Sequence, residues 1–300
     1  MTQPTVALKI DVDTYAGTRD GVPRLHDILG RFGIRATFYF SMGPDNSGKA
    51  IRRIFTRRGF LRKMLRTRAP SIYGPKTLLY GTLLPPPQIA ASFPGILRKT
   101  AELGHEVGIH CWDHVKWHDY LPWLPKPVTA MELGKASSLF QEIFGRRATT
   151  SAAPGWTVSA ESLEIQDAMR LEFCSDSRGT SPFYPAMGGR HFSTLQVPTT
   201  WPTMDELLGE NGITIATVND LYLSLVQPGL NVHTIHAELE GWAMSDTFTA
   251  LLEGLCNRGA RFVTMGEAAA EFGRYAPVCT LSMGEIPGRA GAVALQGTVS

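Results

Sequence analysis

Short apolar runs recur along the chain, and each is followed by turn residues and then by a segment with helical spacing. The apolar runs cover residues 6–13, 36–42, 106–112, 148–153, 173–177, 195–200, 232–237 and 261–265. The helical segments cover residues 23–32, 88–103, 129–144, 160–170 and 246–257. Strands that alternate with helices indicate parallel βα units, and seven or eight strands are enough to close a barrel. Because 300 residues suit one such domain, we expect a single α/β barrel over residues 1–275.

Residues 46–87 interrupt this alternation. Apolar residues recur there every three to four positions, and no acidic residue occurs from Asn46 to Ala101. The pattern predicts an amphipathic helix that is basic on one side. Its first half holds Lys49, Arg52, Arg53, Arg57, Arg58, Arg62, Lys63, Arg66, Arg68 and Lys76. Two interpretations stay open: a solvated insert whose apolar stripe packs on the barrel, or a surface that docks on an anionic membrane.

The bulk composition excludes several classes of protein. A net charge of +2 and a pI near 8.3 give no basis for nucleic-acid binding. The N-terminus lacks the pattern of a secretory signal, which predicts a cytoplasmic protein. The four cysteines lack paired spacing and are expected to be reduced thiols. Residues 276–300 are rich in Gly, Ala and Val without periodicity, and we expect a loosely ordered tail.

The first group of chemically interesting residues follows the first apolar run. Strand alternation places Asp11 and Asp13 on the same side. Two carboxylates that are forced together repel each other, which usually indicates a cation or a shared proton. The alternative is an ordinary capped turn after the strand.

The second group is the string HCWDH at residues 110–114. His110 and His114 meet on one face if the chain makes a helical turn, and two imidazoles then reach one metal ion. Ordinary hydrogen bonds to the two rings are the alternative. With Asp13 as the natural third ligand, open positions remain for water and substrate. Such ligands suit zinc, cobalt, manganese or iron.

The third group lies in residues 232–238, which carry histidines at positions 233 and 236. Alternation turns these two side chains to opposite faces, so only one belongs to the site. His236 is nearer the C-terminal end of the strand, where α/β barrels place their chemistry. His233 is expected to be a packing or surface residue.

Taken together, these motifs resemble the polysaccharide deacetylase family (NodB-type, carbohydrate esterase family 4), and the resemblance covers most of the chain. The matching features are the aspartate pair of the first strand, the string GHEVGIHCWDH at residues 104–114, and the histidine that ends Ile235-His236. The resemblance implies a distorted (β/α)7-type barrel and a metal-dependent amide hydrolase.

The same resemblance implies a role for each residue. Asp13, His110 and His114 would hold one divalent metal ion. Asp11 would be the catalytic base, and His236 would protonate the departing amine. Asp176, in the string CSDSRG at residues 174–179, would orient and charge that histidine.

One departure from the family concerns the third motif. Many members carry an arginine two residues before its proline to orient the base, whereas this chain has Ala152 before Pro154. Arg178 and Arg19 are the candidates to substitute for it.

The departure narrows the resemblance to a subfamily, the deformylases of the lipid-linked aminoarabinose pathway, which share the missing arginine and the basic insert. The matching strings include IDVDT, GTRDGVPRL, GPDN, SAA and TIHAE. This resemblance implies a polyprenyl-phosphate-linked sugar substrate bound by Trp156, Arg178, Arg19 and Glu238. It also implies an enzyme on the cytoplasmic face of the inner membrane, which it contacts through Arg52, Arg53, Arg57, Arg58, Arg62 and Lys63.

Two other functions remain open. A cell-wall or polysaccharide deacetylase would share the five central site residues, but it is expected to carry an export signal and no cationic insert. A non-catalytic barrel that binds sugar or lipid is the second alternative, and the presence of every proposed ligand and proton-transfer group counts against it.

Overall fold

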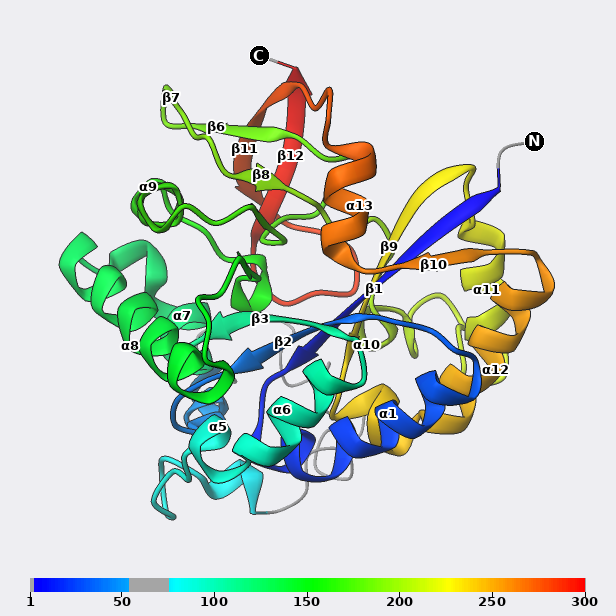
Figure 1. Ribbon diagram of the computed structural model, residues 1–300, viewed down its shortest axis with the longest axis horizontal. Helices are drawn as coiled ribbons and strands as arrows, with labels where there is room; N and C mark the ends of the chain where they lie inside the picture. The colour runs from blue at the N-terminus through cyan, green and yellow to red at the C-terminus, as the bar shows by residue number, and fades with distance from the viewer. Residues whose placement is uncertain (1–2, 54–75, 300) are drawn as a thin grey trace.

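A computed structural model describes residues 3–53 and 76–299, and Figure 1 shows how their elements are arranged. Eight strands form one sheet in which every pair is parallel. They are β1 (Pro4–Val12), β2 (Thr37–Ser41), β3 (Glu106–Cys111), β4 (Thr150–Ser151), β5 (Phe173–Cys174), β8 (Leu195–Gln196), β9 (Gly229–His236) and β10 (Arg261–Val263). Each lies within or across one of the eight predicted runs.

Strand β1 is the centre of this sheet. It pairs with β9 along nearly its whole length, with β10 in its first half and with β2 in its second half. From β2 the order continues through β3, β4 and β5 to β8. The chain after β8 returns to β9, where the N–H groups of Thr200 and Trp201 donate to the Val232 carbonyl at 3.1 and 3.2 Å. An irregular segment therefore bridges the two ends of the curled sheet, and the predicted α/β fold with a distorted barrel is confirmed.

Helices form in all five predicted segments. The helices of the described residues are α1 (Val22–Arg31), α5 (Ile89–Ser92), α6 (Pro94–Glu102), α7 (His114–Tyr120), α8 (Lys126–Phe144), α9 (Ala160–Met169), α10 (Met204–Leu207), α11 (Val218–Leu225), α12 (Ser245–Asn257) and α13 (Met265–Phe272). Of these, α7, α10, α11 and α13 are additional ones that the pattern did not predict. The helix expected over residues 88–103 is divided into α5 and α6. A proline has no backbone N–H to continue a helix, and Pro94 therefore begins a new one.

The two faces of β1 have different environments. Val6, Leu8, Ile10 and Val12 are fully buried in the main hydrophobic core, which also contains residues of α1 and α12. The alternate positions carry Lys9 and Asp11, and they face the interior of the barrel. Side-chain alternation along β1 therefore places apolar residues in the hydrophobic core and the charged residues Lys9 and Asp11 in the barrel interior.

The expectation of a loosely ordered tail is wrong. A second sheet has the order β12, β11, β6, β7, formed by β6 (Tyr184–Met187), β7 (Arg190–His191), β11 (Val278–Gly284) and β12 (Val293–Val299). In Figure 1 it lies beside α13 and includes the C-terminal strand. Cys279, Leu281 and Ala294 pack with Phe183 and Phe192 in a buried cluster. The tail is therefore part of the domain, because its few apolar positions bury against a distant segment.

The insert is described at its two ends. Two short turns flank the undescribed part, η2 (Ser47–Arg52) and η3 (Thr77–Leu79). Arg57, Arg58, Arg62 and Lys63 lie outside the described residues. In the part of the chain that is described, no helix combines the length and the apolar character that crossing a bilayer requires.

His233 on β9 is a packing residue, as expected. Its ring lies 5.3 Å from that of Trp201 and 4.6 Å from that of Tyr222, and the side chain is fully buried. Burial lowers the pKa of His233 from 6.5 to about 3. In the unfolded chain this histidine binds a proton below about pH 6.5, whereas in the folded chain it does so only below about pH 3. The free energy of unfolding therefore decreases as the pH is lowered from 6.5 to 3.

We expect His233→Phe to remove this sensitivity to acid. Between pH 7 and pH 5 the wild type should lose about 2 kcal/mol more of its unfolding free energy than the variant. Urea unfolding at both pH values measures the difference, and His191→Phe at an exposed position is the control. Equal losses in the wild type and His233→Phe would show that His233 takes up protons in the folded state.

Candidate functional site

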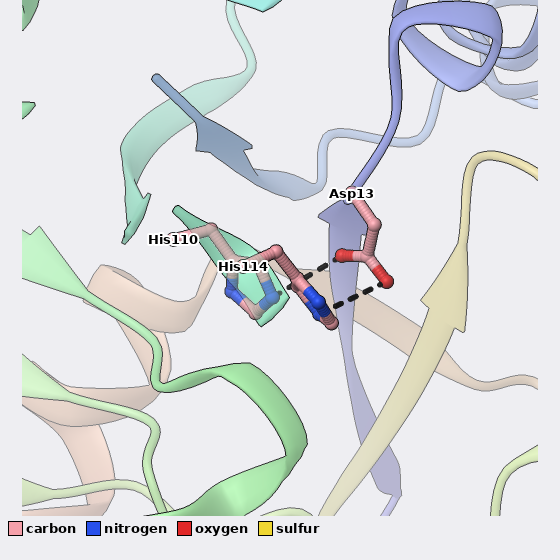
Figure 2. Close-up of side chains that lie close together, drawn as sticks. All are labelled: Asp13, His110 and His114. Carbon is pink, nitrogen blue, oxygen red and sulfur yellow. Dashed lines mark ion pairs between the residues drawn. The ribbon is translucent and has the colours of Figure 1, made fainter. Parts of the chain in front are cut away.

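Asp13, His110 and His114 come together at the C-terminal edge of the barrel sheet (Figure 2). His110 Nε2 lies 3.2 Å from Asp13 Oδ1, and His114 Nε2 lies 3.4 Å from Asp13 Oδ2. One possible ligand atom from each residue lies within 4.8 Å of the others. The three side chains thus offer a carboxylate and two imidazoles to one point.

The two histidines meet across a junction between a strand and a helix. His110 belongs to β3, and His114 is the first residue of α7. Asp113 fixes the junction, since its Oδ1 accepts the Lys116 N–H at 3.0 Å and its Oδ2 accepts the Asn46 amide at 2.7 Å. The two rings therefore meet without the helical turn that the sequence argument supposed, and their centroids lie 5.3 Å apart.

Glu238 holds the loop that carries Asp13. Its Oε1 accepts hydrogen bonds from the backbone N–H groups of Asp13 and Thr14 at 3.0 and 2.8 Å, and from the Thr14 hydroxyl at 2.8 Å. A Cβ atom at Gly17 would lie 2.0 Å from the same oxygen. The glycine is needed for this close approach, and the carboxyl of Glu238 binds protein backbone where substrate contact was expected.

The protonation states in the cluster suit a metal ion. Burial raises the pKa of Asp13, but the imidazoles of His114, His110 and His236 outweigh burial and hold it well below the usual range. Burial lowers the pKa of His114 to about 4. At neutral pH the cluster therefore offers a carboxylate and a neutral imidazole, the forms that bind metals. Asp13 Oδ1 is buried and lacks a hydrogen-bond donor among the described residues, so it has the free lone pairs of a ligand.

Asp11 and His236 flank this cluster on adjacent strands. They are directly paired in the register of β1 and β9. Asp11 Oδ1 lies 4.0 Å from His110 Nδ1, and Asp11 Oδ2 lies 3.2 Å from Lys9 Nζ. The sequence prediction that these five residues share one site is consistent with this placement.

His236 is surrounded by carboxylates. Burial disfavours its imidazolium, but the charges of Asp13, Asp205, Asp11 and Glu240 raise its pKa above the usual value. Glu240 also accepts the backbone N–H of His236 at 2.8 Å. The shift favours the protonated ring, which is the form that a general acid requires.

Asp176 does not take the place expected beside His236. Its Oδ1 accepts the Ala153 N–H at 2.6 Å, and its Oδ2 accepts the Gln166 amide at 2.7 Å. This buried carboxylate therefore holds the third-motif loop in position. Asp205 and Glu240 supply the negative charge that was expected of Asp176.

The two arginines proposed to orient Asp11 are engaged elsewhere. Arg178 donates to Glu206 at 2.9 and 3.0 Å. Arg19 donates to its neighbour Asp20 at 2.8 Å from a largely exposed side chain.

Trp156 is 2% exposed, which leaves little of its ring for substrate. The guanidinium groups of Arg178 and Arg289 lie 4.9 and 4.5 Å from the ring centroid, and its indole N–H donates to Thr199 at 3.1 Å. The contacts found for Trp156 are therefore with protein, and they join the barrel to the C-terminal segment.

Three residues near the site were missed in the sequence. Lys9 carried a signal, because it is a charged residue on the Asp11 side of an apolar strand. Glu240 stood close to His236 in the sequence. Asp205 had no local signal, since it is separated from the other site residues along the chain and approaches them only through the fold.

The sequence has clear relatives. Residues 1–174 match the family described as Polysaccharide deacetylase. A protein of Shewanella sediminis (strain HAW-EB3) is 40% identical over 263 residues, which cover 87% of this chain and 85% of that protein. A protein of Wigglesworthia glossinidia brevipalpis is 32% identical over 283 residues, which cover 93% of this chain and 98% of the relative. Both are named "Probable 4-deoxy-4-formamido-L-arabinose-phosphoundecaprenol deformylase ArnD".

Solved structures share the fold. A structure assigned to the polysaccharide deacetylases, from Mycobacterium smegmatis, superposes with a TM-score of 0.66 at 17% identity and covers 95% of this chain and 96% of its own. Peptidoglycan deacetylase PdaC from Bacillus subtilis superposes with a TM-score of 0.52 at 15% identity and covers 89% and 91% of the two chains. At these identities the likeness concerns the fold alone.

We expect His110→Ala to weaken binding of a divalent cation by more than about 100-fold, the upper end of what loss of an outer-shell partner costs. His118→Gln is the matched control, because His118 follows one helical turn after His114 and lies outside the cluster. Metal content after dialysis, measured by mass spectrometry, tests both variants. Full retention of metal by His110→Ala, or its loss from His118→Gln, would show that other residues form the centre.

Proposed function

The chain belongs to the polysaccharide deacetylase family, and on this premise we propose that it is a metal-dependent hydrolase that deformylates 4-deoxy-4-formamido-L-arabinose linked to undecaprenyl phosphate. The observation that carries the proposal is the convergence of Asp13, His110 and His114 beside the paired Asp11 and His236. Two relatives named for this reaction align over most of the chain. The reaction belongs to the aminoarabinose modification of lipid A, which leads to polymyxin resistance.

Asp13, His110 and His114 are the proposed ligands of one divalent cation. Zinc, cobalt, manganese and iron all suit a donor set of one carboxylate and two imidazoles. When bound, such a cation would act as a Lewis acid that polarises the amide carbonyl and lowers the pKa of a water molecule toward neutrality.

Asp11 is the proposed general base. It takes one proton from the attacking water while the water oxygen forms a bond to the formyl carbon. His236 is the proposed general acid, and it gives its proton to the sugar nitrogen as the C–N bond breaks. The products are formate and the free amine, and both side chains exchange protons with solvent before the next turnover.

The contacts of the substrate-binding candidates divide them into two groups. Arg19 has a largely exposed side chain, and we propose that it can reach a phosphate or sugar hydroxyl. Trp156, Arg178 and Glu238 are bound to protein groups. Their proposed contribution is to fix the walls and loops of the site.

The insert is proposed to bring the site to an anionic membrane surface on the cytoplasmic side. Its described ends are attached to elements of the site. Arg53 pairs with Asp119 on α7, the helix that begins at His114, and the ring of Tyr80 lies 6.5 Å from that of Tyr15, which is two residues after Asp13.

Two features of these ends concern the membrane-facing surface itself. Leu83 is 81% exposed, as an apolar group that enters a lipid headgroup region would be. Arg53, one of the residues expected at the membrane surface, is paired with Asp119, and its side chain is 12% exposed.

Formate release from a formamido-arabinose polyprenyl phosphate is the direct test of the activity. We expect Asp11→Asn and His236→Gln each to lower kcat by about 10²–10⁴-fold, the usual contribution of a positioned proton-transfer group. Asp220→Asn, at an exposed site on α11, should leave the rate unchanged. Full activity of Asp11→Asn would contradict the mechanism, and preferred hydrolysis of the acetamido analogue would contradict the formyl assignment.

A charge-removal variant tests the membrane role. We expect Arg57→Gln, Arg58→Gln, Arg62→Gln and Lys63→Gln together to weaken binding to phosphatidylglycerol vesicles by about 1 kcal/mol per charge. Hydrolysis of a short-chain, water-soluble analogue should be unaffected. The control removes the four exposed charges of Arg98, Lys99, Arg146 and Arg147. Equal vesicle binding by both quadruple variants would contradict the membrane role and favour a solvated insert that packs on the barrel.

A further inference from the structure

Lys9 is a lysine whose whole side chain lies inside the barrel. Its exposed fraction is zero, and it stands on β1 in register with Thr37 and Thr234 on the neighbouring strands. Lysine is almost never fully buried unless it is paired, because removing an ammonium group from water costs several kcal/mol. Its surroundings must therefore compensate the charge.

The compensation comes from the carboxylate of Asp11, from the nearby charge of the buried Asp176 and from two aromatic rings. Lys9 Nζ lies 3.2 Å from Asp11 Oδ2, and both side chains are at least 95% buried. The ammonium also lies 5.0 Å from the ring centroid of Trp156 and 5.9 Å from that of Tyr39. Aromatic faces attract a cation at these distances, and the attraction is stronger where water is absent.

The contact engages only one oxygen of Asp11. Oδ2 faces the ammonium, whereas Oδ1 has no hydrogen-bond donor within the described part of the chain and lies 4.0 Å from His110 Nδ1. A general base has to be held in a fixed orientation for proton transfer. The two oxygens of Asp11 differ in this respect, because Oδ2 lies beside the ammonium and Oδ1 is buried near His110.

Asp11 has no competing partner among the lysines and arginines that the structure describes. Arg178 and Arg19 are bound to Glu206 and Asp20. Ala152, which stands where an arginine was expected from the family resemblance, is buried and apolar. The cation required beside the base is therefore supplied from within β1.

We propose that Lys9 is the positioning residue of Asp11, and that its ammonium, 3.2 Å from Oδ2, fixes the orientation of the Asp11 carboxylate beside the metal cluster. The role rests on the proposed hydrolysis, because it presumes that Asp11 is the base. The close contacts of Lys9 within the described structure are with Asp11, Tyr39 and Trp156, and none is with a proposed metal ligand. Its removal is therefore expected to slow the chemical step without weakening substrate binding.

Lys9→Met tests this role with a neutral side chain of similar length. We expect kcat to fall by about 100-fold, the effect of a small displacement of a catalytic group, while KM and metal content stay at wild-type values. Lys135→Met is the matched control, since Lys135 is an exposed lysine beside the ring of Trp112. Lys9→Arg keeps the charge and should recover part of the lost kcat. A Lys9→Met enzyme with wild-type kcat, or one that has lost its metal, would overturn the proposal.

A double-mutant cycle with Asp11→Asn separates positioning from a general structural role. If Lys9 acts through Asp11, Lys9→Met causes no further loss of kcat in the Asp11→Asn background. A further 100-fold loss in that background would refute the proposal.

Thermal unfolding gives a second result that does not depend on activity. Lys9→Met leaves a buried carboxylate without its partner and should unfold at lower temperature than Lys9→Met/Asp11→Asn, in which both charges are gone. A double variant as unstable as Lys9→Met would refute the ion pair. If the wild type releases no formate, the proposed function is contradicted. The unfolding temperatures still test the Lys9–Asp11 ion pair in that case, because they do not depend on activity.

Discussion

An ionised carboxylate inside the barrel, that of Asp13, is the constraint from which the rest of the site follows. His110 and His114 lie against its two oxygens, and Glu238 binds the backbone that carries it. Burial, together with the neighbouring charge of Asp13, raises the pKa of Glu238 to about 8, so this second carboxyl is neutral at pH 7 and adds no repulsion. The arrangement leaves the excess negative charge on Asp13 and Asp11, where a divalent cation and Lys9 can compensate it.

Local patterns in the sequence predicted the barrel strands and the convergence of Asp13, His110 and His114. Strand alternation puts Asp11 and Asp13 on one side, and short spacing brings His110 near His114, so both features are contained in windows of a few residues. The second sheet was not predictable in this way, because β6 pairs with β11 from a distant part of the chain. Asp205 was missed for the same reason. The role of charging His236 was instead assigned to Asp176, because Asp176 lies in a recognisable local motif.

The site and the insert form one connected region in the described structure. Arg53 ties the insert to the helix that begins with a proposed metal ligand, and Tyr80 packs near the loop after Asp13. A substrate with a polyprenyl tail needs such proximity, because its sugar stays within reach of the membrane surface. In the role proposed for Lys9, a cation within β1 takes the place of the arginine expected at residue 152, where the buried Ala152 stands.

The central claim is that one cation held by Asp13, His110 and His114 makes this site a hydrolase. Titration of chelator-treated enzyme with a divalent metal, followed by formate release from the formamido-arabinose lipid, tests it most directly. The account predicts that activity is absent without metal, rises linearly and reaches its plateau at one equivalent, and that Asp13→Asn stays inactive throughout. Full activity in the chelated enzyme, or equal activation of Asp13→Asn, would contradict it.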